Sequence, residues 1–371
     1  MENTAPLFEK GVYRHHMIKE IHEQPKTVQL EIEGRIKDGF VDLSDLGIDE
    51  LFDGVQKIYM IGCGTAYHAG LVGRTIFEKL LKVAVESDIA SEFGYRDIPW
   101  GNNQLMIVIS QSGETTDTLV ALRKAKERNI PVLAITNVKD STIAREADRV
   151  IYTNAGPEIA IASTKAYTSQ VVVLYLLALY MAKKLGTCDE TVIRKLTEEL
   201  NKIADYVEQT FAEEEKILQI AWQYQHMENT FFLGRGLDCA TAMEGSLKLK
   251  ETSYVHAEAY ATGELKHGPL ALITEGSTVI TVITQDHMVD KCAQNLREIK
   301  NRGGKVIAVC KSSFENELKD LDNLIFIPDV NPIIAPIVSV IPLQIFAYYM
   351  ATFKGNDVDK PRNLTKSVQV E

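Results

Sequence analysis

Apolar residues in this chain recur in short, nearly unbroken runs that end abruptly in polar, glycine-containing turns. The run 106–109 (MIVI) passes directly into the polar stretch 110–115 (SQSGET). After that stretch, apolar residues return with helical spacing at Ala121, Leu122 and Ala125. The pattern predicts a buried strand that opens through a short loop into the N-terminus of a helix.

The same strand-to-turn unit occurs twice along the chain. Gly62 and Gly64 of MIGCGTAYHAG align with Gly234 and Gly236 of FLGRGLDCATA at one common shift. Other landmarks keep the same or nearly the same shift: Glu92 with Glu264, 106–111 with 280–285, 132–136 with 306–310, and Gln170 with Gln344. A near-constant offset over so many landmarks predicts a duplicated domain.

Strands and helices alternate within each copy, which predicts an α/β fold. The strand runs are nearly continuous in Val and Ile, as in strands that are buried on both faces of a parallel sheet. We therefore expect a parallel sheet flanked by helices on both sides in each copy. Ligands of such sheets bind outside the carboxyl ends of the strands. The turns GCGT, SQSGET, GRG and TQDH all follow strand runs, so they lie at edges suited to binding.

The remaining segments frame the two copies. The stretch HHMIKEIHEQP has the pattern of a helix stopped by Pro25, and the longest apolar run, 171–182, is shorter than the ~20 residues that a membrane span needs. We read that run as a buried helix. The expected division is an N-terminal helical segment (1–45), the first copy (46–186), a helical connector (187–225), the second copy (226–355) and a C-terminal tail (356–371).

Composition narrows the classes of function. The net charge of −11 argues against a nucleic-acid partner, because nucleic-acid-binding domains usually carry a basic patch. The five cysteines are scattered without a CxxC pair, which predicts reduced core thiols rather than a disulfide framework or a zinc site. No signal-peptide pattern is visible. We therefore expect a cytoplasmic protein without a metal, a nucleic acid or a membrane as partner.

The polar stretch after the run 106–109 suits a phosphate group. A helix N-terminus offers N–H groups and a partial positive charge, and Gly113 allows a close approach of the backbone. Hydroxyl and amide donors come from Ser110, Gln111, Ser112 and Thr115. Plain helix capping would favour similar residues. The second copy has Thr284, Gln285, Asp286 and His287 here; it lacks the glycine and gains an acid, so we expect it not to hold a phosphate.

A second group of chemical interest follows the GRG turn. Glu244, Lys248 and Glu251 share one face of a predicted helix. The pattern fits a solvated, ion-paired stripe as well as an acid/base cluster, but it lies at the binding edge of the second copy. His267 in GELKHGP is a candidate proton carrier or a packed loop histidine. The two GxG pairs do not extend to GxGxxG, so the signal for a dinucleotide is weak.

Several segments together resemble one family. CGTAYHAG, SQSGETTDTL, NAGPEIAIASTKAYTSQ, LKLKE, HAEAYATGELKHGPLALI and DVDKPRNLTKSVQVE are similar to the isomerase half of glucosamine-6-phosphate synthases (glutamine–fructose-6-phosphate aminotransferases). The resemblance runs from about Gly11 to Glu371. It implies two tandem sugar-isomerase (SIS) domains, each a three-layer α/β/α unit, and neither a cofactor nor a metal.

The resemblance also implies a role for each matching residue. The phosphate binders would be Ser110, Gln111, Ser112 and Thr115. The sugar would contact Thr65 and Ser163, together with the backbone at Ile161 and Thr365. The catalytic set would be Glu251, Lys248, His267 and Lys366. Glu251 moves a proton between C1 and C2 of the sugar with Lys248 assisting, His267 opens the ring from the neighbouring subunit of a homodimer, and Lys366 forms a Schiff base with the open ketose.

Two positions depart from the family pattern. Ala66 stands where a serine is common, so one sugar contact is absent or replaced, and Thr365 stands where alanine is usual. The tail has apolar anchors at Leu364, Val368 and Val370. We expect it to fold back over the active site and to deliver Lys366.

The implied activity is the conversion of fructose 6-phosphate, with ammonia, to glucosamine 6-phosphate or to glucose 6-phosphate, for amino-sugar biosynthesis. The first cysteine is Cys63, so we expect no glutaminase activity from this chain, and amination would use free ammonia or a separate glutaminase subunit. Two alternatives stay open. One is a glucosamine-6-phosphate deaminase, which runs the reaction backwards, and the other is a non-catalytic SIS module that senses a sugar phosphate.

Overall fold

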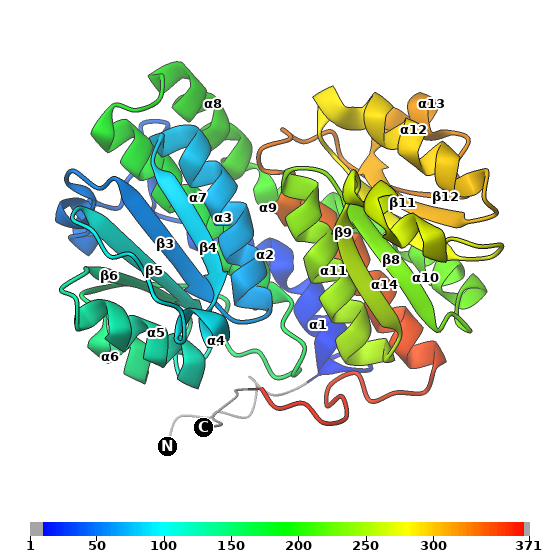
Figure 1. The fold of residues 1–371 in the computed structure, drawn as a ribbon, viewed down its shortest axis with the longest axis horizontal. Coiled ribbons are helices and arrows are strands. Elements are labelled where there is room, and N and C mark those ends of the chain that lie inside the picture. The colour runs from blue at the N-terminus through cyan, green and yellow to red at the C-terminus, as the bar shows by residue number, and fades with distance from the viewer. Residues whose placement is uncertain (1–9, 367–371) are drawn as a thin grey trace. The chain divides into compact units, whose positions relative to one another are not determined.

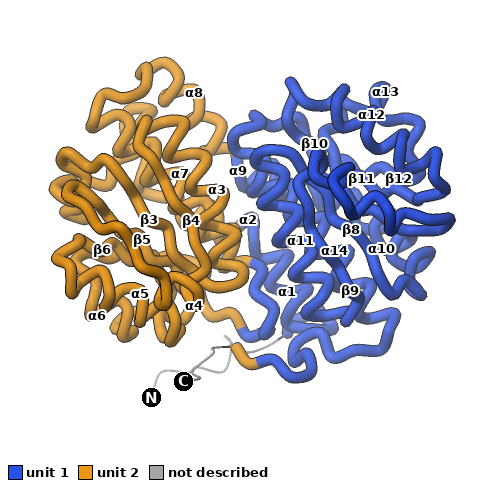
Figure 2. The backbone as a smooth tube through the Cα atoms, in the orientation of Figure 1, with its two compact units in different colours: residues 1–25, 159–164, 203–364 blue, residues 26–158, 165–202, 365–371 orange. Residues whose placement is uncertain are grey.

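The computed structural model describes residues 10–366, which form two compact units (Figure 2). Each unit contains one copy of the sequence repeat, and we call them the first-copy unit and the second-copy unit. Among the described residues, the first-copy unit comprises 26–158, 165–202 and 365–366, and the second-copy unit comprises 10–25, 159–164 and 203–364.

The first-copy unit is built on a five-stranded parallel sheet with the order β4-β3-β5-β6-β7. Apolar side chains from alternate positions of β3, β5 and β6 pack with α5 and α6 in one buried cluster. Helices α3 and α7 pack together in the other helical layer (Figure 1). The bounds are β3 Lys57–Gly62, α3 Thr65–Leu81, β4 Ala84–Ile89, α4 Ala90–Phe93, β5 Gln104–Ser110, α5 Thr116–Lys126, β6 Val132–Thr136, α6 Thr142–Glu146, β7 Arg149–Tyr152 and α7 Lys165–Leu185.

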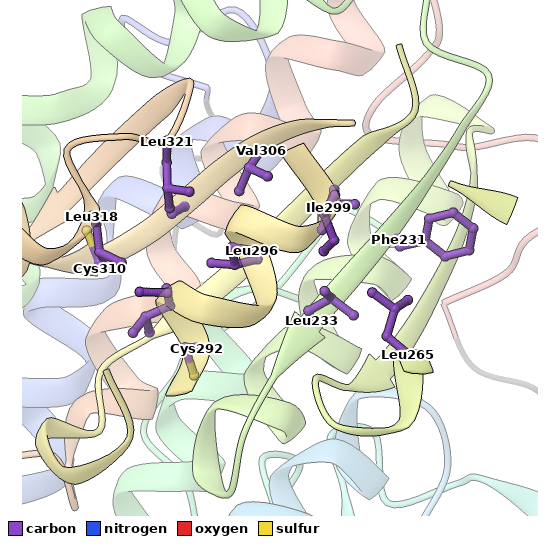
Figure 3. Close-up of a cluster of buried hydrophobic side chains, with 14 of the residues drawn as sticks. Phe231, Leu233, Leu265, Cys292, Leu296, Ile299, Val306, Cys310, Leu318 and Leu321 are labelled. Carbon is purple, nitrogen blue, oxygen red and sulfur yellow. The ribbon is translucent and has the colours of Figure 1, made fainter. Parts of the chain in front are cut away.

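The second-copy unit repeats this plan with the strand order β9-β8-β10-β11-β12, again all parallel. Figure 3 shows one of its core clusters, in which Leu296 and Ile299 of α12 meet Leu233 and Val306 of the sheet. The bounds are β8 Asn229–Gly234, α11 Leu237–Ser253, β9 His256–Ala261, β10 Thr278–Ile283, α12 Val289–Lys300, β11 Lys305–Lys311, α13 Glu315–Leu318, β12 Asn323–Ile327 and α14 Ala335–Phe353.

The strands and the long helices of the two copies correspond, as the repeat predicts. Helices α3 and α11 have 17 residues each, and their first residues keep the offset of the glycine pairs that precede them. Each helix begins after a glycine with positive φ, 52° at Gly64 and 58° at Gly236. Each is followed by a left-handed residue, Lys82 with φ 59° and Tyr254 with φ 60°. The predicted α/β class, with two parallel sheets flanked by helices, is confirmed.

Helices α7 and α14 are long and apolar enough to cross a membrane by length and composition. The most apolar window of α7 is 100% buried in the protein and that of α14 is 83% buried. Both are therefore core helices of their own units. The apolar run 171–182 lies within α7, as the prediction of a buried helix requires.

The N-terminal segment differs from the prediction at Pro25. Helix α1 (His16–His22) ends before the proline, and α2 (Gln24–Ile32) contains it as its second residue. Proline is favourable there, because the first N–H groups of a helix have no partner within the helix. A short hairpin that the sequence did not indicate follows, with β1 at Ile36–Lys37 and β2 at Phe40–Val41. Within 187–225 lie α8 (Glu190–Asn201), α9 (Ile203–Thr210) and α10 (Glu214–Gln223).

Candidate active site

The loop after β5 forms a small cradle at the carboxyl end of the first-copy sheet. Ser110, the last residue of β5, is 2% exposed, and its Oγ accepts a hydrogen bond from the N–H of Gly113 at 3.0 Å. The same Oγ lies 3.1 Å from Oγ1 of Thr115. The Ser112 hydroxyl accepts the N–H of Glu114 at 3.2 Å. The loop thus gathers hydroxyl groups around its own backbone.

Gly113 is the position that only glycine fits in this loop. Its φ is +65°, and a Cβ there would lie 2.0 Å from Oγ of Ser141 and 2.9 Å from Oγ1 of Thr136. The N–H of Thr142, the first residue of α6, donates to the Glu114 carboxylate at 2.7 Å. This hydrogen bond holds the loop against the N-terminus of α6. This close packing explains why the sequence has a glycine at position 113.

Helix α5 begins directly after this cradle, and α3 begins at the end of the neighbouring strand. Thr115 is the N-cap of α5, with extended backbone and no side-chain cap to its own helix. Its hydroxyl therefore serves the loop instead of capping α5. Thr65 is the first residue of α3, and β3, which precedes it, pairs directly with β5. Two helix N-termini and their hydroxyl groups therefore meet one edge of the sheet, which is an arrangement suited to an anion.

The equivalent loop of the second-copy unit is occupied by a carboxylate of the protein itself. Asp238, in the first turn of α11, accepts the N–H of Thr284 at 2.8 Å and also accepts the Thr284 hydroxyl. Nε2 of Gln285 lies 3.4 Å from the same carboxylate. Burial raises the pKa of Asp238 to about 6, against the opposing effect of these donors. An internal acid thus takes the donors that a phosphate would need.

The charged residues predicted on α11 form a buried cluster. Nζ of Lys248 lies 2.6 Å from Oε2 of Glu251 and 3.4 Å from Oε1 of Glu244. The side chains of Lys248 and Glu244 are 0% exposed, and that of Glu251 is 21% exposed. The alternative of a solvated stripe is therefore wrong. Two buried charges in contact cost desolvation energy, and here only Glu251 retains access to solvent.

The other predicted residues lie on separate segments. His267 is exposed on a 3₁₀ turn at Glu264–His267 of the second-copy unit. Ile161 and Ser163 are partly exposed on the 159–164 segment of that unit, where the N–H of Ile161 donates to the carbonyl of Asp359 at 3.0 Å. Gln111 is partly exposed in the loop after β5. The structure therefore brings together two predicted groups, the hydroxyl loop and the α11 cluster, each within its own unit.

The described part of the predicted tail ends in an ion pair. Thr365 is exposed, and Nζ of Lys366 lies 2.6 Å from Oε2 of Glu158. Residues 367–371, including Val368 and Val370, lie outside the described residues. Sequence reasoning did not single out Glu158. An acid between Pro157 and the apolar stretch that follows it was the available signal.

Three of the five cysteines have thiols of raised pKa. All five have free thiols. Burial raises the pKa of the Cys63 thiol, beside the first glycine pair, and raises those of Cys292 and Cys310 to about 11 and about 12. Thiols with raised pKa values are weak nucleophiles. Cys63, Cys292 and Cys310 are therefore not candidate nucleophiles.

Comparison with known proteins gives a family for this arrangement. The SIS domain model matches residues 51–180 and 224–354. The glutamine–fructose-6-phosphate aminotransferase (isomerizing) of Clostridium tetani (strain Massachusetts / E88) is 52% identical over 370 residues, which cover 99% of this chain and 61% of that protein. The chain thus spans about three fifths of the length of the relatives that it matches.

Solved structures agree with this assignment. The C-terminal domain of glucosamine-fructose-6-phosphate aminotransferase from Francisella tularensis has a TM-score of 0.92 and 42% identity, covering 95% of this chain and 100% of that one. Glucosamine-6-phosphate deaminase from Thermotoga maritima has a TM-score of 0.77 and 25% identity, covering 95% and 99%. This chain belongs to the SIS domain family and corresponds to the C-terminal, double-SIS part of the glutamine–fructose-6-phosphate aminotransferases.

Proposed function

We propose that this chain is a ketose–aldose isomerase of the glucosamine-6-phosphate synthase type, which converts fructose 6-phosphate and ammonia to glucosamine 6-phosphate. The observation that carries the proposal is the buried cluster on α11, in which Lys248 lies between Glu244 and Glu251. A module that only senses a sugar phosphate has no need of a buried acid/base group. The cost of burying these charges is understandable if they move a proton.

The loop after β5 is the proposed phosphate site. The lack of a side chain at Gly113 lets the loop pack against Ser141 and Thr136, and the N-terminus of α5 supplies N–H groups and a partial positive charge. The binding groups are those of Ser110, Gln111, Ser112 and Thr115. Thr65, Ser163 and the backbone at Ile161 and Thr365 would contact the sugar. The phosphate is then a remote handle whose binding energy fixes the reacting carbons in position.

The proposed chemistry begins with ring opening, for which His267 carries the proton. The Lys366 amine adds to the C2 ketone, and loss of water gives an imine. Ammonia displaces the lysine from C2 and leaves an imine of ammonia. Glu251 then removes a proton from C1 and returns it at C2, while the C1 hydroxyl gives up its proton and the nitrogen gains one, so that C1 becomes an aldehyde and C2 carries the amine. Without ammonia, hydrolysis of the lysine imine and the same proton shift give glucose 6-phosphate.

Lys248 has two proposed tasks in this sequence. Its ammonium holds the Glu251 carboxylate in one orientation through the 2.6 Å contact. It also places a positive charge close to the proton transfer, where negative charge develops on the sugar oxygen at C1. Glu244 balances that ammonium from the other side at 3.4 Å.

The substitution Glu251→Gln tests the central role. We expect turnover of fructose 6-phosphate to fall by about 10²–10⁴-fold, the usual contribution of a general acid/base. Substrate binding, measured by calorimetry, should stay within a few-fold. Lys250→Gln, an exposed change on the same helix, is the control and should retain full turnover. Normal turnover in the Glu251 variant would remove its proposed role.

We also propose a homodimer in which His267 serves the site of the neighbouring subunit. The exposed position of His267 in its own unit supports this. Mixing two inactive variants, His267→Asn and Glu251→Gln, should restore activity, because one site of each mixed dimer would have both intact residues. Two inactive variants that stay inactive after mixing and subunit exchange would argue against donation across an interface.

A second candidate is the deaminase direction, which the likeness to glucosamine-6-phosphate deaminase from Thermotoga maritima supports. The same residues would convert glucosamine 6-phosphate to fructose 6-phosphate and ammonia. Assays in both directions, with ammonium as the nitrogen source, would separate the two candidates. Glutamine in place of ammonium would test whether a separate glutaminase subunit is needed. Phosphorylated sugars are intermediates of the cell interior, so the expected cytoplasmic location goes with this proposal.

A further inference from the structure

Glu158 makes two contacts in the first-copy unit that its position in the sequence does not reveal. Its Oε2 lies 2.6 Å from Nζ of Lys366, and its Oε1 accepts the N–H of Ala166 at 3.1 Å. The Glu158 side chain is 0% exposed, whereas that of Lys366 is 27% exposed. The carboxylate is therefore shielded from water, while the amine that it holds remains accessible.

The contact with Ala166 fixes the carboxylate in place. Ala166 is the second residue of α7, where the N–H groups have no partner within the helix. The stretch that leads to Glu158 is also held within the first-copy unit, because the N–H of Asn154 donates to the buried carboxylate of Glu31 at 2.5 Å. Oε1 of Glu158 is thus held by the backbone of α7, while Oε2 faces Lys366.

A lysine that forms an imine needs a proton acceptor close by. An ammonium has no lone pair, so it must lose a proton before the nitrogen can attack a carbonyl carbon. A base that takes this proton has to lie within hydrogen-bonding distance of the amine. Oε2 of Glu158 meets that condition at 2.6 Å.

We propose that Glu158 accepts the proton that activates Lys366 and returns it to the water that leaves. This inference rests on the proposed function, in which Lys366 attacks C2. The ammonium gives one proton to Glu158, and the nitrogen lone pair forms the N–C2 bond while the carbonyl π bond breaks. A second proton passes from nitrogen to the former carbonyl oxygen. The protonated Glu158 then donates to that hydroxyl, water departs, and a protonated imine remains beside the restored carboxylate.

The test compares the parent with Glu158→Gln. A glutamine can still accept the N–H of Ala166, but it cannot take a proton from Lys366. At neutral pH we expect turnover to fall by about 10²–10⁴-fold, with KM for fructose 6-phosphate changed only a few-fold. Borohydride added with fructose 6-phosphate should reduce the imine, and mass spectrometry of the peptide with Lys366 should find the adduct forming more slowly in the variant.

The pH profile separates proton transfer from a merely structural role. Lysine amines lose their protons increasingly as the pH rises towards 10, so alkaline solution should restore part of the lost activity in Glu158→Gln. The control is Glu20→Gln, since Glu20 is a buried carboxylate that accepts the N–H groups of Ile159 and Ala160 at 2.5 and 3.3 Å. Any activity that this control loses should not return at high pH.

The outcomes distinguish the two proposals. An active parent without an adduct on Lys366 would overturn both the imine and the role of Glu158. An adduct that forms equally fast in the parent and in Glu158→Gln, with the same pH profile, would overturn the role of Glu158 alone. If the glutamine variant does not fold, Glu158→Asp keeps a proton acceptor on a shorter side chain. It should then lose less activity than Glu158→Ala and keep the parent's pH profile, and equal losses in the two would contradict the proposal.

Discussion

The two copies share one backbone plan but differ in where they carry polar and charged side chains. In the first-copy unit the loop after β5 packs its own hydroxyl groups around Gly113, and α3 has Val72 and Ile76 in its buried face. In the second-copy unit the loop after β10 is filled by Asp238, and α11 has Glu244 and Lys248 at the positions equivalent to Val72 and Ile76. The first-copy unit thus has the hydroxyl loop and an apolar helix face. The second-copy unit has the charged cluster and a loop whose donors are taken by Asp238.

Position 66 shows how small the difference is. Ala66 is the equivalent of Asp238, because each directly follows the first residue of its helix. A methyl group at position 66 cannot accept a hydrogen bond from the β5 loop. A carboxylate at position 238 takes up the donors of Thr284 and Gln285. Alanine at position 66, where the second copy has an acid, thus leaves the first-copy loop without the internal carboxylate that Asp238 supplies.

The largest effect is expected from making α11 resemble α3. The double substitution Glu244→Val and Lys248→Ile removes the buried pair, so turnover should fall by about 10²–10⁴-fold as proton transfer fails. The protein should stay folded, because replacing a buried ion pair by apolar residues is often neutral or stabilising by about 1–4 kcal/mol. Isomerase assays and thermal unfolding would measure the two effects.

The single substitution Lys248→Ile is the contrast for that experiment. It leaves Glu244 buried without its ammonium, and breaking a buried pair in this way costs about 3–5 kcal/mol. We expect the single variant to melt well below the double variant. If the single variant were the more stable of the two, the account of Lys248 as the counter-ion that the buried Glu244 needs would be wrong.

The second prediction introduces into the first copy the acid that the second copy carries at the equivalent position. In Ala66→Asp, the new carboxylate should accept donors from the β5 loop, as Asp238 does from Thr284. It should compete with the phosphate and raise KM for fructose 6-phosphate by about 10²–10³-fold, which corresponds to about 3–4 kcal/mol. Ala66→Asn has the same size without the charge and should raise KM far less. Equal KM values for the two variants would contradict an anion site at this loop.

The sequence was sufficient for the architecture because its signals are local or periodic. The apolar runs, the glycine pairs and the near-constant offset between the copies specify two parallel sheets, and the structure contains both. The hairpin of β1 and β2 has two residues in each strand and left no periodic signal. At Pro25 the same residue can end one helix or begin the next, and only the structure shows which.

The chemistry of the site was predictable in type but not in environment. The spacing of Glu244, Lys248 and Glu251 is the same for a solvated stripe and for a buried cluster, so burial had to come from the packing of α11. The partner of Lys366 lies 208 residues away in the chain, and no local pattern connects the two. The contact between Asp238 and Thr284 is likewise long-range, because Thr284 lies 46 residues further along the chain. The catalytic and binding roles themselves remain predictions.

A third prediction concerns Gly113, whose lack of a side chain lets the first-copy loop pack against Ser141 and Thr136. Gly113→Ala places a Cβ at φ +65°, 2.0 Å from Oγ of Ser141. Strain of this kind costs about 1–3 kcal/mol, and relief by movement of the loop should raise KM about 10-fold. His287→Ala, at the equivalent place in the second copy, is the matched control and should leave KM unchanged. A normal KM and melting temperature in Gly113→Ala would show that the loop tolerates the side chain.

The smallest effect is expected from a change at Asp238. It would appear in the way the free energy of unfolding depends on pH. The pKa of Asp238 is raised from 3.8 to about 6 in the folded chain, so the folded state binds a proton more tightly than the unfolded state does. Its contribution to stability is therefore complete below pH ~4 and is lost as the pH rises through 6, a change of about 3 kcal/mol. In Asp238→Asn this component disappears, and the free energy of unfolding should fall less steeply between pH 4 and 7 than in the parent.

Glu31, whose pKa burial raises to about 7, acts in the same direction in both proteins, so it cancels in the difference between them. Urea unfolding of the two proteins at several pH values would measure that difference. Parallel curves would mean that Asp238 keeps its charge in the folded protein at pH 4 to 6, and that its donors outweigh its burial.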